Sequence, residues 1–193
     1  MAIDDQSIQK LGRWPWPRAY VAELIDAVNE GKPSLIATNI LFTEADRNSG
    51  LEEVRAIRKQ IEDGGRIDAR LNGVLGALNQ AERRLDNDAF LGESISRAKN
   101  VLLPMYFIPG QQPDTRADIP DQLKKSSLNA PDFISFQSAS EQSLPIKPFL
   151  QGASAFGHLN LFADADGTLR RETLFIRYGS QIFPSFALQA ALA

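Results

Sequence analysis

The alternation of hydrophobic and polar residues near the start of the chain predicts an amphipathic helix. After Pro17, apolar residues recur at the three- and four-residue spacing of a helix; they are Tyr20, Val21, Leu24, Ile25 and Val28. Proline is tolerated in the first turn of a helix because the N–H groups there have no intrahelical partner. Gly31 and Pro33 end the pattern. We therefore expect a helix over residues 17–30, packed on one face of a sheet.

Two short apolar runs predict strands inside that sheet. Residues 35–42 and 101–108 are almost continuously apolar, which is typical of parallel strands covered on both faces. Pro104 has no N–H to donate to a neighbouring strand, so it favours an edge position or a bulge in the second run. The apolar start of the chain, followed at once by Asp4 and Asp5, indicates the polar end of a further strand. We therefore expect the chain to open with a β-α-β unit.

Three apolar stripes over residues 44–99 predict a helical insertion between the two runs. Their members are Leu51, Val54, Ile57 and Ile61, then Ile67, Leu71, Val74, Leu75 and Leu78, and finally Phe90, Leu91 and Ile95. Glycines 64 and 65 end the first stripe, and Asp86 or Asp88 begins the third. The insertion is longer than a single crossover between strands requires.

A polar stretch after the second apolar run predicts a long surface loop. Residues 109–131 are rich in charged and turn-forming residues, and one helical turn is expected at residues 121–125. Residues 132–143 have no firm pattern. Residues 144–156 favour a short helix that turns its apolar side chains inward; these are Phe149, Leu150 and Ala153.

The C-terminal part of the chain predicts a β-hairpin followed by a helix. Two alternating segments, residues 158–163 and 169–178, flank the sequence DADGT, in which glycine accepts a positive φ and aspartate bonds its own backbone. A second turn is expected at residues 179–180, and a last helix after Pro184. The fold class is therefore α/β, with a mixed sheet, helices packed on its faces, a β-α-β start and a C-terminal β-hairpin followed by a helix.

The composition is that of an ordinary globular protein. The chain has 193 residues, of which 43% are hydrophobic and 23% charged, and its formal net charge is −3, so we expect a single domain. The basic stripe that a nucleic-acid partner needs is missing. The absence of cysteine excludes disulfides and thiolate sites. The sequence has no apolar run of ~18 residues that could span a membrane and no glycine-rich phosphate motif, and we expect neither a cofactor nor a metal.

Four polar residues form the candidate ligand-binding site: Asp4, Asp5, Arg18 and Asn39. Open α/β sheets bind ligands at the carboxyl ends of their parallel strands. The expected β-α-β unit places the two aspartates at such an end, Arg18 at the start of the helix and Asn39 on the next strand. Two alternatives remain open, in which the aspartates cap a helix or turn and Arg18 forms an internal salt bridge with one of them. No residue pattern selects a catalytic group.

Other conspicuous residues have a structural and a functional interpretation. Trp14 and Trp16, in a corner bracketed by prolines, either line an apolar pocket for a small molecule or pack the corner onto the sheet. His158 is the only histidine; no catalytic triad can be argued from it, and we expect it half-buried on a strand face. The turn at residues 164–168 is superficially similar to a calcium loop but lacks the later bidentate glutamate, so a plain turn is expected.

Three blocks of the sequence, in this order, resemble the type-two CHASE domain (cyclases/histidine kinases associated sensory extracellular domain). The first is the Asp-Asp pair followed by GRWPWPR at residues 12–18. The second joins GHLN at residues 157–160 to DADGTLRR at residues 164–171. The third is PSFAL at residues 184–188. These blocks cover about half of the chain, and the helical middle and the polar loop have no counterpart.

The resemblance implies an extracytoplasmic (periplasmic) sensor domain of a bacterial membrane receptor. Its output would be a cytoplasmic histidine kinase, nucleotide or diguanylate cyclase, or protein kinase, reached through transmembrane segments outside this chain. Such a domain is not itself an enzyme; its stimulus is a small molecule or a protein, and a homodimer is expected. Asn39 stands where the family often has aspartate, and the chain stops at Ala193, before further strands of the family. We therefore expect a truncated sensor domain.

Two other functions compete with a sensor at this stage. One is a soluble cytosolic α/β enzyme whose carboxylate-based site uses Asp4, Asp5 and Arg18. The other is a protein–protein interaction module without a small ligand. A ligand that binds only the native protein and raises its apparent stability would argue against the interaction module.

Overall fold

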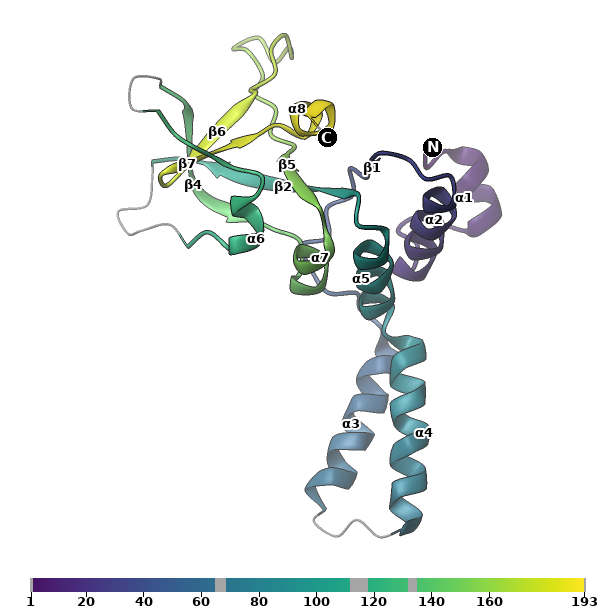
Figure 1. Cartoon of the computed structure of the whole chain (residues 1–193). Helices are drawn as coiled ribbons and strands as arrows, with labels where there is room; N and C mark the ends of the chain where they lie inside the picture. The colour runs from purple at the N-terminus through teal and green to yellow at the C-terminus, as the bar shows by residue number, and fades with distance from the viewer. Residues whose placement is uncertain (1, 65–68, 112–117, 132–134, 193) are drawn as a thin grey trace.

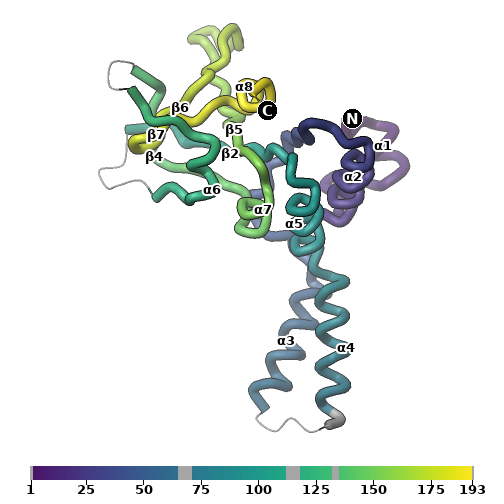
Figure 2. The backbone as a smooth tube through the Cα atoms, in the orientation of Figure 1, coloured from purple at the N-terminus to yellow at the C-terminus, as the bar shows by residue number. Residues whose placement is uncertain are grey.

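The computed structural model describes residues 2–64, 69–111, 118–131 and 135–192, and shows a mixed α/β body from which a two-helix arm extends (Figures 1 and 2). Within these residues the helices are α1 (Asp5–Leu11), α2 (Arg18–Glu30), α3 (Ser49–Asp63), α4 (Ala69–Leu85), α5 (Asn87–Ala98), α6 (Asp121–Lys124), α7 (Lys147–Gly152) and α8 (Phe186–Leu192). The strands are β1 (Ile36–Ala37), β2 (Val101–Pro109), β3 (Leu128–Asn129), β4 (Gln137–Ser143), β5 (Ala155–His158), β6 (Phe175–Tyr178) and β7 (Gln181–Pro184). The predicted α/β class, with a mixed sheet, a C-terminal hairpin and a final helix, is confirmed.

Strand β2 organises the sheet, because it pairs with three other strands. It runs parallel to β1 and β5 and antiparallel to β4, and the sheet continues from β4 through β6 and β7 to β3. Its residues Val101 to Met105 are buried, as the apolar run predicts. Pro104 lies between the stretch paired with β1 and the stretch paired with β4, so its missing N–H needs no edge position. The expected edge is wrong, and the irregularity in β2 falls between Ile108 and Pro109.

The β-α-β unit is formed by β1, helices α3 to α5 and the parallel strand β2, and not by the first residues of the chain. Asp4 caps helix α1 instead of ending a strand. Its carboxylate accepts hydrogen bonds from Ser7 N at 2.9 Å and from Ser7 Oγ at 2.7 Å, which satisfies a backbone donor of the first turn. The strand expected over residues 35–42 is confined to β1. The helix expected after Pro17 is confirmed by α2.

Helices α2, α5 and α7 pack against one another and close the core over β2. Their buried side chains include Ile25 of α2, Ile95 of α5 and Phe149 of α7, and all three belong to the same cluster as Phe107 of β2. Helix α8 packs on β5. This arrangement fixes the start of α2 beside α5, where the candidate site is found.

Helices α3 and α4 leave the body side by side as an arm, at the bottom of Figure 1. Asn48 caps α3, since its Oδ1 accepts from Leu51 N at 3.2 Å, and Asp86 caps α5 in the same way. The three helices expected between residues 44 and 99 are thus present. Ile67, which was expected on the second of them, lies outside the described residues.

The C-terminal hairpin is formed by β6 and β7 around Gly179, whose φ of 61° suits glycine. The hairpin predicted around residues 164–168 is wrong. Its turn does form, with Asp164 N donating to Thr168 O at 3.0 Å, but β5 pairs with β2 rather than with β6. The helix expected over residues 144–156 is confined to α7, because the segment after it becomes β5 in the sheet.

Two elements in the middle of the chain complete the comparison. Helix α6 supplies the single turn expected in the polar loop, together with the short strand β3. Strand β4 occupies most of the stretch that had no firm pattern. Its sequence QSASEQS is polar and only Ala139 is buried, so hydrophobic alternation could not indicate it.

The block Gly157-x-x-Asn160 explains how β5 begins and ends. A Cβ atom on Gly157 would lie 2.5 Å from Cα of Phe186, so glycine lets α8 approach the sheet this closely. Asn160 is buried, and its amide bonds both backbone groups of Phe107: Phe107 N donates to Oδ1 at 2.9 Å, and Nδ2 donates to Phe107 O at 2.6 Å. The asparagine side chain therefore continues the pairing of β2 beyond the end of β5.

Candidate ligand-binding site

A cleft of about 1180 Å³ lies between the tryptophan corner, the start of α2 and the segment that leads into the arm. The corner contributes Trp14 and Trp16, and α2 contributes Arg18. Residues 39–42 and 44–49 form the opposite wall. The cleft therefore joins elements that are distant in the sequence, which is typical of a small-molecule site.

The two indoles form one wall of the cleft. Their ring centroids are 5.5 Å apart with the planes at 76°, an edge-to-face contact. Trp16 Nε1 donates to Gly12 O at 2.7 Å, which ties the corner to the end of α1. Both indoles are half-buried. Of the two interpretations made from the sequence, this geometry agrees with an apolar wall open to a small molecule.

Arg18 is held by groups of the protein itself. It donates to a carboxylate oxygen of Asp88 at the start of α5 and to the backbone oxygen of Glu44. Its guanidinium also lies over two rings, 5.4 Å from the centroid of Phe42 and 5.3 Å from that of Phe149. Only 13% of the Arg18 side chain is exposed. The internal salt bridge considered from the sequence is present, but its partner is Asp88 and not Asp4 or Asp5.

The other three predicted site residues are placed differently. Asn39 lines the cleft; its side chain is exposed and has no hydrogen-bond partner among the described residues. Asp4 and Asp5 are exposed and do not line the cleft. The hydrogen bonds from Ser7 lower the pKa of the Asp4 carboxyl. The structure thus brings Arg18 and Asn39 together, and it corrects the placing of the two aspartates, which begin a helix instead of ending a strand.

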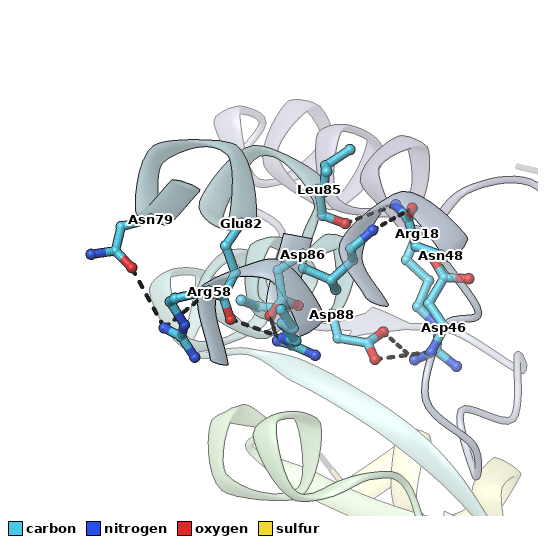
Figure 3. A network of polar contacts seen from close by, with 12 residues as sticks. Arg18, Asp46, Asn48, Arg58, Asn79, Glu82, Leu85, Asp86 and Asp88 are labelled. Atoms are coloured by element: carbon cyan, nitrogen blue, oxygen red, sulfur yellow. Dashed lines mark hydrogen bonds and ion pairs between the residues drawn. The ribbon is translucent and has the colours of Figure 1, made fainter. Parts of the chain in front are cut away.

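A polar network links the cleft to the base of the arm (Figure 3). Asp88 accepts from Asp46 N at 2.9 Å as well as from Arg18. Asn48, which lines the cleft and caps α3, donates from Nδ2 to Leu85 O at 2.9 Å. The sequence analysis missed these residues as part of the site. The capping aspartates were visible as a helix start, but nothing local could indicate which arginine Asp88 would meet.

The remaining candidates have structural roles. Arg170 pairs with Asp164 at 3.1 Å and with Asp166 at 2.8 Å, so arginine closes the exposed turn that was compared with a calcium loop. The same guanidinium lowers the pKa of Asp166 to about 2. Within the described ranges, no group of three or more histidine, cysteine, aspartate or glutamate side chains could hold a metal ion.

His158 is buried more deeply than expected. It is 1% exposed, not half-buried, and its ring lies edge-on to Phe107 at 6.3 Å. Neither ring nitrogen has a hydrogen-bond partner among the described residues. Burial lowers the pKa of this histidine to about 4, because the interior disfavours the charged form.

The comparison with models of protein families matches the CHASE2 domain over residues 1–193. It confirms the resemblance carried by the three sequence blocks, and the matched range includes the helical middle and the polar loop. The comparisons with curated proteins and with solved structures found no match. None of the helices in the described ranges has both the length and the apolar character that a membrane crossing needs.

Proposed function

The chain belongs to the CHASE2 domain family of sensory domains of signal transduction receptors, and we propose from this that it is the extracytoplasmic signal-input domain of a bacterial membrane receptor. The proposed output is a cytoplasmic histidine kinase or nucleotide cyclase, reached through membrane segments outside residues 1–193. The domain itself does no chemistry in this proposal; it binds a stimulus and changes conformation, since a ligand shifts an equilibrium by its differential affinity for two states.

The cleft beside the tryptophan corner is the proposed stimulus site, and the observation that carries this is the convergence of Trp14, Trp16 and Asn39 on one cavity. Two half-buried indoles offer a flat apolar surface. The free amide of Asn39 offers one acceptor and two donors. A cavity with an apolar wall and a few polar groups is the usual form of a ligand site.

The charges of the cleft narrow the class of ligand. Its lining contains two cations and two anions: Arg18, Arg47, Glu44 and Asp46. The charge of Arg18 is already neutralised by Asp88. An anion would therefore find little uncompensated positive charge, which supports a small, flat and mostly apolar ligand with one or two uncharged hydrogen-bonding groups.

The two indoles also supply the assay. The chain has only two tryptophans and both line the cleft, so intrinsic fluorescence reports on this cavity alone. Small aromatic compounds would be screened for a change in emission together with a rise in Tm. Asn39→Ala should weaken a ligand so found about tenfold, the value of one hydrogen bond. Asp5→Asn, which lies outside the cleft, is the control and should change neither affinity nor Tm.

The same two variants would be placed in the intact receptor, with output and folding stability measured in parallel. Altered output for Asn39→Ala at unchanged stability would support a sensing role for the cleft. Output that is altered equally by Asp5→Asn, or that only follows lost stability, would contradict it.

A further inference from the structure

The arm presents an apolar surface that no described part of the chain covers. Helices α3 and α4 pack chiefly on each other and project from the body (Figure 1). Two helices side by side bury only the seam between them, and most helices in proteins depend on packing of a whole apolar face. Leu51 is the only buried residue of α3, while Ile57 and Val74 are 45% and 46% exposed.

The exposed apolar residues lie on one flank of the seam. At 3.6 residues per turn, residues three and four apart share a side of a helix, and the antiparallel course of the two helices turns both apolar sides in the same direction. We call this flank the arm face; it consists of Val54, Ile57, Ile61, Val74, Leu78 and Ala81. The opposite flank is polar and carries Glu52, Lys59, Asn72 and Arg83, all exposed.

Contacts across the seam fix the register of the two helices. Near the base of the arm, a Cβ on Gly50 would lie 3.7 Å from the Leu85 side chain. About one turn further along, Arg55 Nε donates to Glu82 at 2.8 Å. Residues between these two levels on α3 therefore lie opposite residues between Glu82 and Leu85 on α4.

Glu53 and Arg84 lie at the same height in this register, on the two outer edges of the arm face. Glu53 is one turn before Ile57 and Arg84 is one turn after Gln80, so each side chain is on the side of its helix away from the seam. Both are exposed, and neither has an ion-pair partner among the described residues. One edge of the face is thus acidic and the other basic at one level.

We propose that the arm face docks on the arm face of a second copy of this chain, with a two-fold axis along the arm. This rotation lays α3 of each copy antiparallel to α4 of the other and brings Glu53 of each copy beside Arg84 of the other. An arrangement of α3 against α3 would instead set Glu53 against its own symmetry mate, which is unfavourable. The resulting four-helix bundle buries both apolar faces. The proposal does not depend on the ligand of the cleft.

Site-specific crosslinking tests this geometry, and the chain has no cysteine to interfere. The double variant Glu53→Cys/Arg84→Cys, treated with a short-spacer bismaleimide, should give a product of twice the 21.3 kDa of one chain. The two positions face away from each other within one copy, so a short spacer links them only between copies. The matched control, Glu52→Cys/Arg83→Cys, changes the same residue types one position away on the polar flank and should give no such product.

Sedimentation of charge-reversed variants gives an independent test. Glu53→Arg should raise the dimer Kd about tenfold, from two symmetric contacts, and adding Arg84→Glu should restore it to within about threefold. Glu52→Arg is the control and should leave the Kd unchanged. Ile57→Asp should give a monomer with an unchanged circular dichroism spectrum, because this side chain is exposed. A monomer at all concentrations, dimer crosslinks from the control pair, or no rescue by the double reversal would overturn the proposal.

Discussion

Replacing His158 by leucine should remove a large part of the acid sensitivity of this domain. The histidine is 1% exposed, and neither ring nitrogen has a partner among the described residues. Burial lowers its pKa to about 4 in the folded protein, whereas an unfolded histidine has a pKa of about 6.5. As the pH falls, the unfolded chain therefore binds the proton first. The stability that depends on neutral His158 is fully present above about pH 6.5 and is lost as the pH falls toward about 4.

The size of the effect follows from these two pKa values. Their difference corresponds to about 3 kcal/mol when the pH is below both of them. At pH 5 about 2 kcal/mol of this is already lost, and at pH 8 almost none. Leucine has nearly the volume of histidine and does not titrate, so His158→Leu should lose none of it.

The assay is urea denaturation of the natural protein and the His158→Leu variant at pH 8 and pH 5. The difference between their free energies of unfolding should shift by about 2 kcal/mol in favour of the variant between these pH values. The carboxylates are common to both proteins, so their titration cancels in the difference. A difference that stays constant within about 0.5 kcal/mol would refute the reasoning, because it would mean that His158 keeps an ordinary pKa.

Three further substitutions test the fold and the site by chemical denaturation. Asn160→Leu should cost about 2–4 kcal/mol, because both backbone groups of Phe107 lose a buried partner; a cost below about 1 kcal/mol would mean that water replaces the amide. Gly157→Ala should cost about 2 kcal/mol or more and speed hydrogen exchange in α8, whose backbone is 2.5 Å from the added Cβ; unchanged exchange would contradict this. Arg18→Ala should cost about 2–4 kcal/mol, because it leaves the carboxylate of Asp88 unpaired; unchanged stability would return Arg18 to the ligand.

The helices could be predicted from the sequence because their signals are local. The periodic residues of α2 and the capping aspartate of α5 lie within the elements that they define. The start of the chain failed for a related reason. Asp4 was taken as the end of a strand, but a carboxylate three residues before Ser7 caps a helix equally well, and that hydrogen bond decided the structure.

The strands were predicted less well because their partners are distant in the sequence. The turn at Asp164 was correct, but the strand before it pairs with β2, where Asn160 bonds Phe107 across 53 residues. The site has the same limitation. Arg18 was expected to meet an aspartate next to it in the sequence, and it meets Asp88, 70 residues away. Local turn and cap chemistry therefore fixes where segments bend, while the buried core fixes which segments meet.

The segment formed by residues 44–48 belongs to the cleft and to the base of the arm at once. Asn48 lines the cleft, caps α3 and bonds Leu85 O at the end of α4. Asp46 N bonds the carboxylate of Asp88 at the start of α5. A ligand that displaced this segment would have to lengthen hydrogen bonds to both helices of the arm, at about 1–3 kcal/mol for each buried group left unpaired. Couplings of this size are the usual range of allosteric effects. Because such coupling is reciprocal, contact between two arms should in turn change the affinity of the cleft.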